Sequence, residues 1–246
     1  GWGEAWNSVI RVQDIPVLYL PYMTYPVSNK RKTGLLFPKI GSSQKLGLDI
    51  ELPYYLNLAE NYDLTLTPRY MSERGTQLKS EFRYLTAQHR GALHLEYLNK
   101  DQEKPTAFGS RYLANFQHLA DFNSRWRASV DFTDVSDDGY LTELGSDINN
   151  QSDTQLYRQA GLSYYGDAVR SELRLQGFET LGNYQSSYAA LPQLDIKAAK
   201  PIPLGAGLEF LWNGQYAHFE NDQQLIQSAD RLHLEPSIRL PYYTSA

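Results

Sequence analysis

The stretch LPYYLNLAENYDLTLTPRYM, residues Leu52–Met71, decides the fold. From Tyr62 onward, one side of the chain carries Tyr62, Leu64, Leu66, Pro68 and Tyr70, and the other carries Asp63, Thr65, Thr67 and Arg69. Apolar and polar side chains that alternate with a period of two are typical of a β-strand, because successive side chains point to opposite faces. Two such runs on either side of ENYD predict a β-hairpin.

The same alternation recurs along the rest of the chain and predicts roughly twelve strands after residue 32. We expect them near 33–43, 45–58, 62–73, 76–87, 90–100, 110–120, 124–135, 155–166, 168–180, 187–199, 205–219 and 230–243. No helical period competes with this pattern, so the sequence predicts an all-β fold.

The connections between these strands alternate in length. Short ones are expected near 60–61, 88–89, 121–123, 167 and 200–204, and mostly longer, polar ones near 101–109, 136–154, 181–186 and 220–229. In an antiparallel up-and-down sheet alternate connections lie at opposite ends, as in outer-membrane barrels with short periplasmic turns and long extracellular loops. The pattern therefore predicts that both ends of this segment are periplasmic.

Composition excludes several classes of protein. The 246 residues carry a net charge of −5 with interleaved charges, so there is no basic footprint for nucleic acid. There is no Cys, which excludes disulfides and thiolate metal sites within the segment. No apolar run reaches the length of a transmembrane helix, whereas a transmembrane strand needs only about 9 to 11 residues. The chain starts at Gly1 without an initiator Met, which is typical of a mature or excised segment.

Alternation alone fits both a soluble antiparallel sandwich and a transmembrane barrel. Three features favour the barrel. The expected strands, of about 11 to 14 residues, exceed the usual soluble length of about 5 to 6. Aromatic residues lie near strand ends, and the face opposite the apolar one carries charge in almost every strand, as suits a water-filled interior. A soluble carbohydrate-binding sandwich and a passive porin remain as alternatives.

The first 32 residues differ from the rest. Their short apolar runs are interrupted by Pro16, Pro21 and Pro26, and they end near the basic loop SNKRKTG. We therefore expect residues 1–32 to be the end of a preceding domain with a linker, and residues 33–246 to be the N-terminal part of the barrel.

Beyond these patterns, LPYYLNLAENYDLTLTPRYM followed by SERG and EFRYLT resembles the start of the barrel in the LptD family of lipopolysaccharide-assembly proteins. IPVLYLPY, the KRKTG loop and GLLFP resemble the family's junction between a periplasmic β-jellyroll and the barrel, and VDFTDVSDDGY, LPQLDI and RLHLEPSIRLP resemble later strands. The resemblance implies a jellyroll followed by a barrel of about twenty-six strands, of which this chain is a partial or truncated form of roughly twelve.

The resemblance implies lipopolysaccharide transport into the outer leaflet of the Gram-negative outer membrane, with the N-terminal part of the chain in the periplasm. It also implies the partners: lipopolysaccharide and outer-membrane lipids, the plug lipoprotein LptE, the bridge protein LptA through the jellyroll, and the β-barrel assembly machinery during insertion. The lipid would leave sideways between the first and last strands of the barrel.

Prolines are candidates for weakening such a lateral gate, because proline donates no ladder hydrogen bond. Pro21, Pro26 and Pro38 cluster near the first strand, and Pro38 is the best placed; the first two can equally mark a linker. Lys30, Arg31 and Lys32 lie near the expected periplasmic rim, where they either contact lipid A phosphates or form a solvated basic loop.

The charged face is expected to line the interior, with Arg125, Arg127, Arg170, Glu172 and Arg174 as its representatives. They suit a saccharide or a plug protein, or simply solvate the interior. The histidines His89, His94, His118, His218 and His233 are candidate catalytic bases, but no GxSxG, HExxH or comparable spacing surrounds them. The sequence thus predicts no enzyme, no cofactor and no metal site.

Overall fold

The structure is a computed structural model that describes residues 2–12, 14–26, 31–104, 109–148, 154–182, 184, 188–203, 207–221 and 227–240. Almost all regular structure in it is antiparallel β-strand, and α1 (Tyr140–Leu144) is a short helix. Among the described residues no helix is long and apolar enough to cross a bilayer. The prediction of an all-β, up-and-down fold is confirmed.

The strands follow one another along the chain. They are β1 (Trp2–Val12), β2 (Ile15–Pro26), β3 (Gly34–Leu35), β4 (Lys39–Ser43), β5 (Gly47–Glu51), β6 (Tyr54–Ala59), β7 (Tyr62–Met71), β8 (Gly75–Leu85), β9 (His89–Leu98), β10 (Arg111–Asp121), β11 (Trp126–Val135), β12 (Gln155–Tyr165), β13 (Val169–Thr180), β14 (Ala189–Pro201), β15 (Glu209–Glu220) and β16 (Ala229–Arg239).

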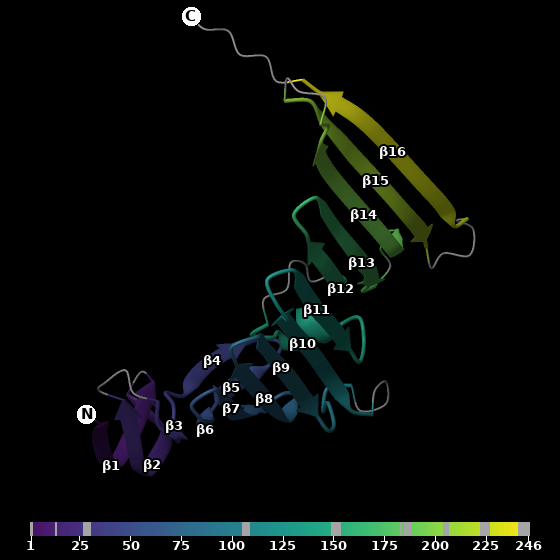
Figure 1. Cartoon of the computed structure of the whole chain (residues 1–246). Coiled ribbons are helices and arrows are strands. Elements are labelled where there is room, and N and C mark those ends of the chain that lie inside the picture. The colour runs from purple at the N-terminus through teal and green to yellow at the C-terminus, as the bar shows by residue number, and fades with distance from the viewer. Residues whose placement is uncertain are drawn as a thin grey trace, which may run out of the picture. The chain divides into compact units, whose positions relative to one another are not determined.

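β1 and β2 form a sheet of their own, whereas β3 to β16 belong to one 14-stranded sheet in which β4 and β16 stand at the two ends of the strand order. The chain divides into two compact units, Gly1–Leu85 with Ala92–Ala114 and Val135–Ile148, and Thr86–Gly91 with Asn115–Asp134 and Asn149–Ala246. Within the second unit, β12 to β16 lie side by side in chain order (Figure 1). The sheet thus has the sequential topology that the alternating connections predicted.

The structure splits two of the expected strands. Strand 33–43 becomes β3 and β4, and strand 45–58 becomes β5 and β6. The first break ends at Pro38 and the second contains Pro53, and a proline has no N–H to offer the ladder. The pairing changes partner here: β3 pairs with β6, β4 pairs with β5, and the Leu36 amide donates to the Pro53 carbonyl at 2.8 Å.

The two faces of the sheet are inverted relative to a soluble protein. In neighbouring positions of β8, the Gln77 and Lys79 side chains are 0% and 8% exposed, whereas Leu78 between them is 49% exposed. β7 repeats this with buried Asp63 and exposed Tyr70. A soluble sandwich would bury the apolar face, so the inversion indicates that the apolar face meets hydrocarbon and the polar face lines the interior.

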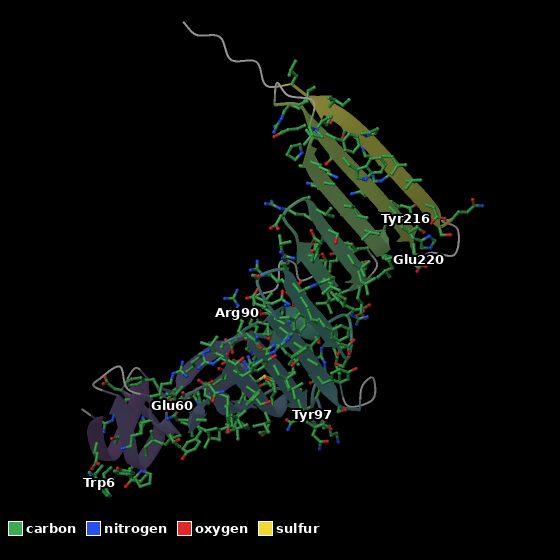
Figure 2. All side chains as sticks on the ribbon, in the orientation of Figure 1. Trp6, Glu60, Arg90, Tyr97, Tyr216 and Glu220 are labelled. Carbon is green, nitrogen blue, oxygen red and sulfur yellow. The ribbon has the colours of Figure 1, made fainter. Side chains whose placement is uncertain are left out.

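The second unit has the same apolar face. Large aliphatic side chains remain exposed on four of its strands, namely Leu162, Leu173, Leu175, Leu191, Leu232, Leu234 and Ile238. The side chains stand on both faces of the ribbons, and the labelled Tyr216 and Glu220 belong to the C-terminal part of β15 (Figure 2). β1 and β2 belong to a different sheet from β3, and the division of the chain near residue 32 into the end of a jellyroll and the start of a barrel stays a prediction.

Candidate functional site

Residues 136–148, called the insert, fold over the polar face of the first unit. Arg69 on β7 donates to the Leu144 carbonyl at 2.9 Å, and Gln77 on β8 donates to the Tyr140 hydroxyl at 2.7 Å. Tyr140 in turn donates to Glu96 on β9 at 2.8 Å. Tyr140, Leu141 and Leu144 of α1 are buried. The insert thus closes over polar side chains from three strands and supplies the cover that a soluble protein would build from apolar residues.

Arg111, the first residue of β10, is fully buried at the centre of an ionic cluster. Its Nε and Nη2 atoms donate to the two Asp137 carboxylate oxygens at 2.9 and 2.7 Å. Its Nη1 donates to Asp101 at 2.7 Å and to Glu143 at 2.9 Å. A planar guanidinium with five N–H donors can serve several carboxylates at once, which an ammonium group cannot do with the same geometry. Arg111 therefore ties the insert to β10 and to the connection that follows β9.

Arg74 is a second cation in this cluster, and a glycine positions it. It donates to Asp101 at 3.0 Å and lies 2.7 Å from a Glu103 oxygen. The three-residue turn 72–74 ends at Gly75, whose φ of +109° disfavours other residues; a Cβ there would also lie 3.3 Å from the Lys100 carbonyl oxygen. The turn chemistry of SERG thereby directs a buried arginine inward.

A second ionic group lies at the C-terminal end of the insert. Lys79 on β8 donates to Glu51 at 2.6 Å and to Asp147 at 3.1 Å. Lys39 on β4 also donates to Asp147, at 3.0 Å. Asp147 therefore links the insert to β4 and to β8, so that β4 is held by a contact on the polar face of the sheet.

The insert carries groups whose pKa values reflect this environment. Burial and the neighbouring Glu96 carboxylate raise the pKa of Tyr140, so its hydroxyl remains a donor at neutral pH. For Asp147 burial opposes ionisation, but the hydrogen bond from Lys39 and the charge of Lys79 lower its pKa from 3.8 to about 2. Glu143 follows the same logic: despite desolvation, Lys104 and Arg111 lower its pKa.

These shifts predict that the docked insert is stable to moderate acid. A carboxylate with a lowered pKa binds fewer protons in the docked state than in the released state, so docking weakens only as pH falls. A nitroxide on exposed Asp138 is expected to keep the same mobility between about pH 8 and pH 5 and to become mobile between about pH 4 and pH 2. A nitroxide on Glu60, in the turn between β6 and β7, is the control and should not change. Release of the insert near pH 6 would contradict this assignment.

The predicted gate prolines fall in two places. Pro38 lies between β3 and β4, in the break of the first strand, whereas Pro21 and Pro26 lie in β2, which pairs with β1. Sequence reasoning did not single out Pro53, which is buried opposite this break. The sequence did contain a signal for Pro53, because a second proline in the adjacent expected strand removes another hydrogen-bond donor from the ladder.

The basic loop is described in part. Arg31 lies 3.5 Å from the buried Asp63 carboxylate, which also receives hydrogen bonds from Arg83 at 2.8 Å and from Tyr55 at 3.1 Å. Lys32 is exposed, and Lys30 lies outside the described residues. Arg31, one of the three predicted phosphate contacts, therefore forms an ion pair with the start of β7.

The predicted interior residues lie in the second unit. Arg170, Glu172 and Arg174 alternate along β13 with Val169, Ser171 and Leu173, and Arg174 donates to Glu172 at 2.8 Å. Arg127 on β11 pairs with Asp121, and Arg125 lies 3.5 Å from Asp167. Their assignment to a wet interior stays a prediction that this alternation supports.

The histidines occupy ordinary positions on the sheet. His89 stacks on His118 with ring centroids 5.7 Å apart, His218 contacts Asp230 at 2.9 Å, His94 lies 3.9 Å from Glu81, and His233 lies 3.8 Å from Glu235. Within the described part of the chain, no three His, Cys, Asp or Glu residues are grouped so that they could hold a metal ion. The candidate site is therefore the set of charged and polar contacts between the insert and the polar face of the first unit.

Comparisons with known proteins identify the family of this chain. Residues 109–246, more than half of the chain, match the family model described as LptD, LPS transport system D. The chain belongs to the LptD family. The resemblance of the sequence motifs to LptD is thereby confirmed.

Individual LptD relatives match almost the whole chain. Identity is 47% over 242 residues to the LPS-assembly protein LptD of Pseudoalteromonas translucida (strain TAC 125), covering 98% of this chain and 32% of the relative. Identity is 44% to that of Idiomarina loihiensis, with 97% and 31% covered. The chain therefore spans about a third of the length of these relatives. Among solved structures, the outer membrane protein OprD from Pseudomonas aeruginosa matches with 12% identity and a TM-score of 0.36, covering 98% of this chain and 75% of OprD.

Proposed function

We propose that this chain forms part of a barrel that moves lipopolysaccharide into the outer leaflet of the outer membrane. The observation that carries the proposal is the inverted sheet, with apolar side chains such as Leu78 outside and ionised ones such as Lys79 and Arg69 under cover. An amphiphile with acyl chains and a charged saccharide needs both surfaces side by side. The insert favours this over a passive porin, because it occupies the polar face that would line an open channel.

The lipid leaves the interior through a lateral gate at the first strand of the barrel, which consists of β3 and β4. Two adjacent strands are broken at Pro38 and Pro53, and each proline lacks the backbone N–H that another residue would offer to the ladder. Each missing ladder bond costs about 0.5 to 1.5 kcal/mol of pairing stability. Ion pairs hold both sides of the break, Lys39 with Asp147 above it and Arg31 with Asp63 beside the junction. The seam is weakened at one level while its ends stay anchored.

We propose the remaining assignments on the support of family membership. The barrel lies in the outer membrane with residues 1–32 in the periplasm, where LptA delivers lipopolysaccharide through the jellyroll. LptE fills the interior as a plug, and the β-barrel assembly machinery inserts the chain. Lys30, Arg31 and Lys32 are the proposed contacts for lipid A phosphates, and Arg31 exchanges its contact with Asp63 for such a phosphate as the lipid passes.

Restoring the two backbone donors is expected to slow lipid release. In the full-length protein with its plug partner, Pro38→Thr and Pro53→Thr together should reduce delivery of lipopolysaccharide to acceptor vesicles about thirtyfold, because two ladder bonds of about 1 kcal/mol each must now break. Pro201→Thr, at the end of β14 and not adjacent to β3 or β4 in the strand order, is the matched control. Unchanged delivery by the double variant would remove these prolines from the mechanism. Absence of delivery by the unaltered protein would refute the transport function itself.

A further inference from the structure

The polar face of β12, β13 and β14 contains a hollow of about 420 Å³ in the second unit. The strand register places its lining residues in rows. Tyr165 pairs with Arg170 and Arg170 with Lys197, while Ser163 pairs with Glu172 and Glu172 with Asp195. Arg174 and Gln193 form the next row. Pockets for small molecules measure about 300 to 1,000 Å³, so this hollow has the size of a small-ligand site.

Two cations face each other in the hollow. Arg170 and Lys197 are direct partners in the β13–β14 register, and both are exposed. Among the described residues, no carboxylate lies within ion-pair distance of either cation. The nearby carboxylates have other partners: Glu172 pairs with Arg174 at 2.8 Å, and Asp195 accepts from Gln193 and Gln215, each at 2.7 Å. Like charges directly opposite each other destabilise an antiparallel pair. An anion bound between the two side chains would remove this repulsion.

The remaining lining fits a sugar. Glu172, Asp195 and Gln193 offer acceptors for hydroxyl groups, and the Ser163 hydroxyl can donate or accept. The Tyr165 ring lies beside Arg170, with the Arg127 guanidinium carbon 5.7 Å from its centroid, and offers an aromatic face for the C–H groups of a pyranose. A simple inorganic anion would use the two cations alone and leave these groups without a role.

We propose that this hollow binds a phosphorylated sugar, with the phosphate between Arg170 and Lys197 and the sugar ring toward Tyr165, Glu172 and Asp195. The inference rests on the proposed function, since lipopolysaccharide carries phosphorylated sugars. The hollow lies near the short turns after β12 and β14, which is the end where the saccharide enters if those turns are periplasmic. It then holds the saccharide in the interior while the acyl chains follow a separate path.

The test uses the full-length protein with its plug partner in detergent and measures binding of glucose 6-phosphate, glucose and inorganic phosphate by calorimetry. We expect glucose 6-phosphate to bind at least about fivefold more tightly than phosphate, and Arg170→Gln with Lys197→Gln to weaken it at least about tenfold, as loss of two charge-assisted contacts requires. Lys200→Gln removes the same charge from the opposite face of β14 and should leave binding unchanged. Arg170→Lys should retain most of the binding, and heat-modifiable migration on gels verifies that each variant is folded.

Three results would overturn the site. Equal affinity for phosphate and glucose 6-phosphate would show an anion site without sugar recognition, and equal binding by the double variant would place the site elsewhere. A photo-crosslinker at Ser163 that captures only the plug protein would assign the hollow to a protein contact. Delivery of lipopolysaccharide to vesicles by the unaltered protein is measured in parallel, so loss of this site with intact delivery leaves the proposed function standing.

Discussion

Replacing Arg111 by glutamine is expected to release the insert and to destabilise the folded chain by about 3 to 5 kcal/mol, the typical cost of removing one partner from a buried ion pair. Arg111 is fully buried and is shared by Asp101, Asp137 and Glu143. Without it, Asp101 and Glu143 keep ion pairs with Arg74 and Lys104, whereas Asp137 keeps hydrogen bonds but no ion pair within the described residues. The three carboxylates then repel one another in a region of low water content. The free energy of unfolding in lipid bilayers, measured with guanidinium, checks the magnitude.

Two variants separate the role of this charge from its geometry. Arg111→Lys keeps the charge but loses the two-pronged contact with Asp137, so we expect an intermediate loss. Arg125→Gln is the matched control, because Arg125 is exposed and lies 3.5 Å from an exposed Asp167, a pair worth about 0 to 1 kcal/mol. A nitroxide on Asp138 should become mobile in Arg111→Gln and stay ordered in the control. If Arg111→Gln cost no more than Arg125→Gln, the cluster would not hold the insert.

The strands could be predicted from the sequence because their signal is local. Each alternating run, such as Tyr62 to Tyr70, reports a period of two without reference to any other part of the chain. The breaks in the first two strands were missed because Pro53 also fits the alternation, as a member of the polar face. Only when Pro38 and Pro53 are placed side by side does the loss of two donors at one level become visible.

The insert could not be predicted in the same way. Its helix YLTEL is shorter than two turns and shows no period of its own, so the stretch 136–154 was expected to be a polar connection. The partners of Arg111 lie 10, 26 and 32 residues away along the chain. Ion pairs of that separation depend on register and on how a loop folds back, which composition does not determine. Among the interior residues, the alternation of Arg170, Glu172 and Arg174 was visible because it lies within a single strand.

Replacing Leu173 by arginine is expected to prevent efficient insertion, whereas arginine at Gln176 is expected to be tolerated. Leu173 lies in the middle of β13, pairs with Leu162 and Leu194 on its neighbours, and is 38% exposed on the apolar face. An arginine on the lipid face near the middle of the bilayer costs about 2 to 4 kcal/mol. The fraction of folded protein in bilayers, read from heat-modifiable migration, should therefore fall strongly for Leu173→Arg.

The comparison with Gln176→Arg makes this a test of the face and not of the added charge. Gln176 stands in the same strand on the opposite face, pairs with Gln159, and alternates with the same apolar set. Both variants add one positive charge and a side chain of the same size, so they differ mainly in the solvent that the new guanidinium meets. In water the charge costs little, whereas in hydrocarbon it must be desolvated or drawn to the interface. Equal folding of the two variants would mean that both faces are wet, and the inverted sheet would then need another explanation than a membrane.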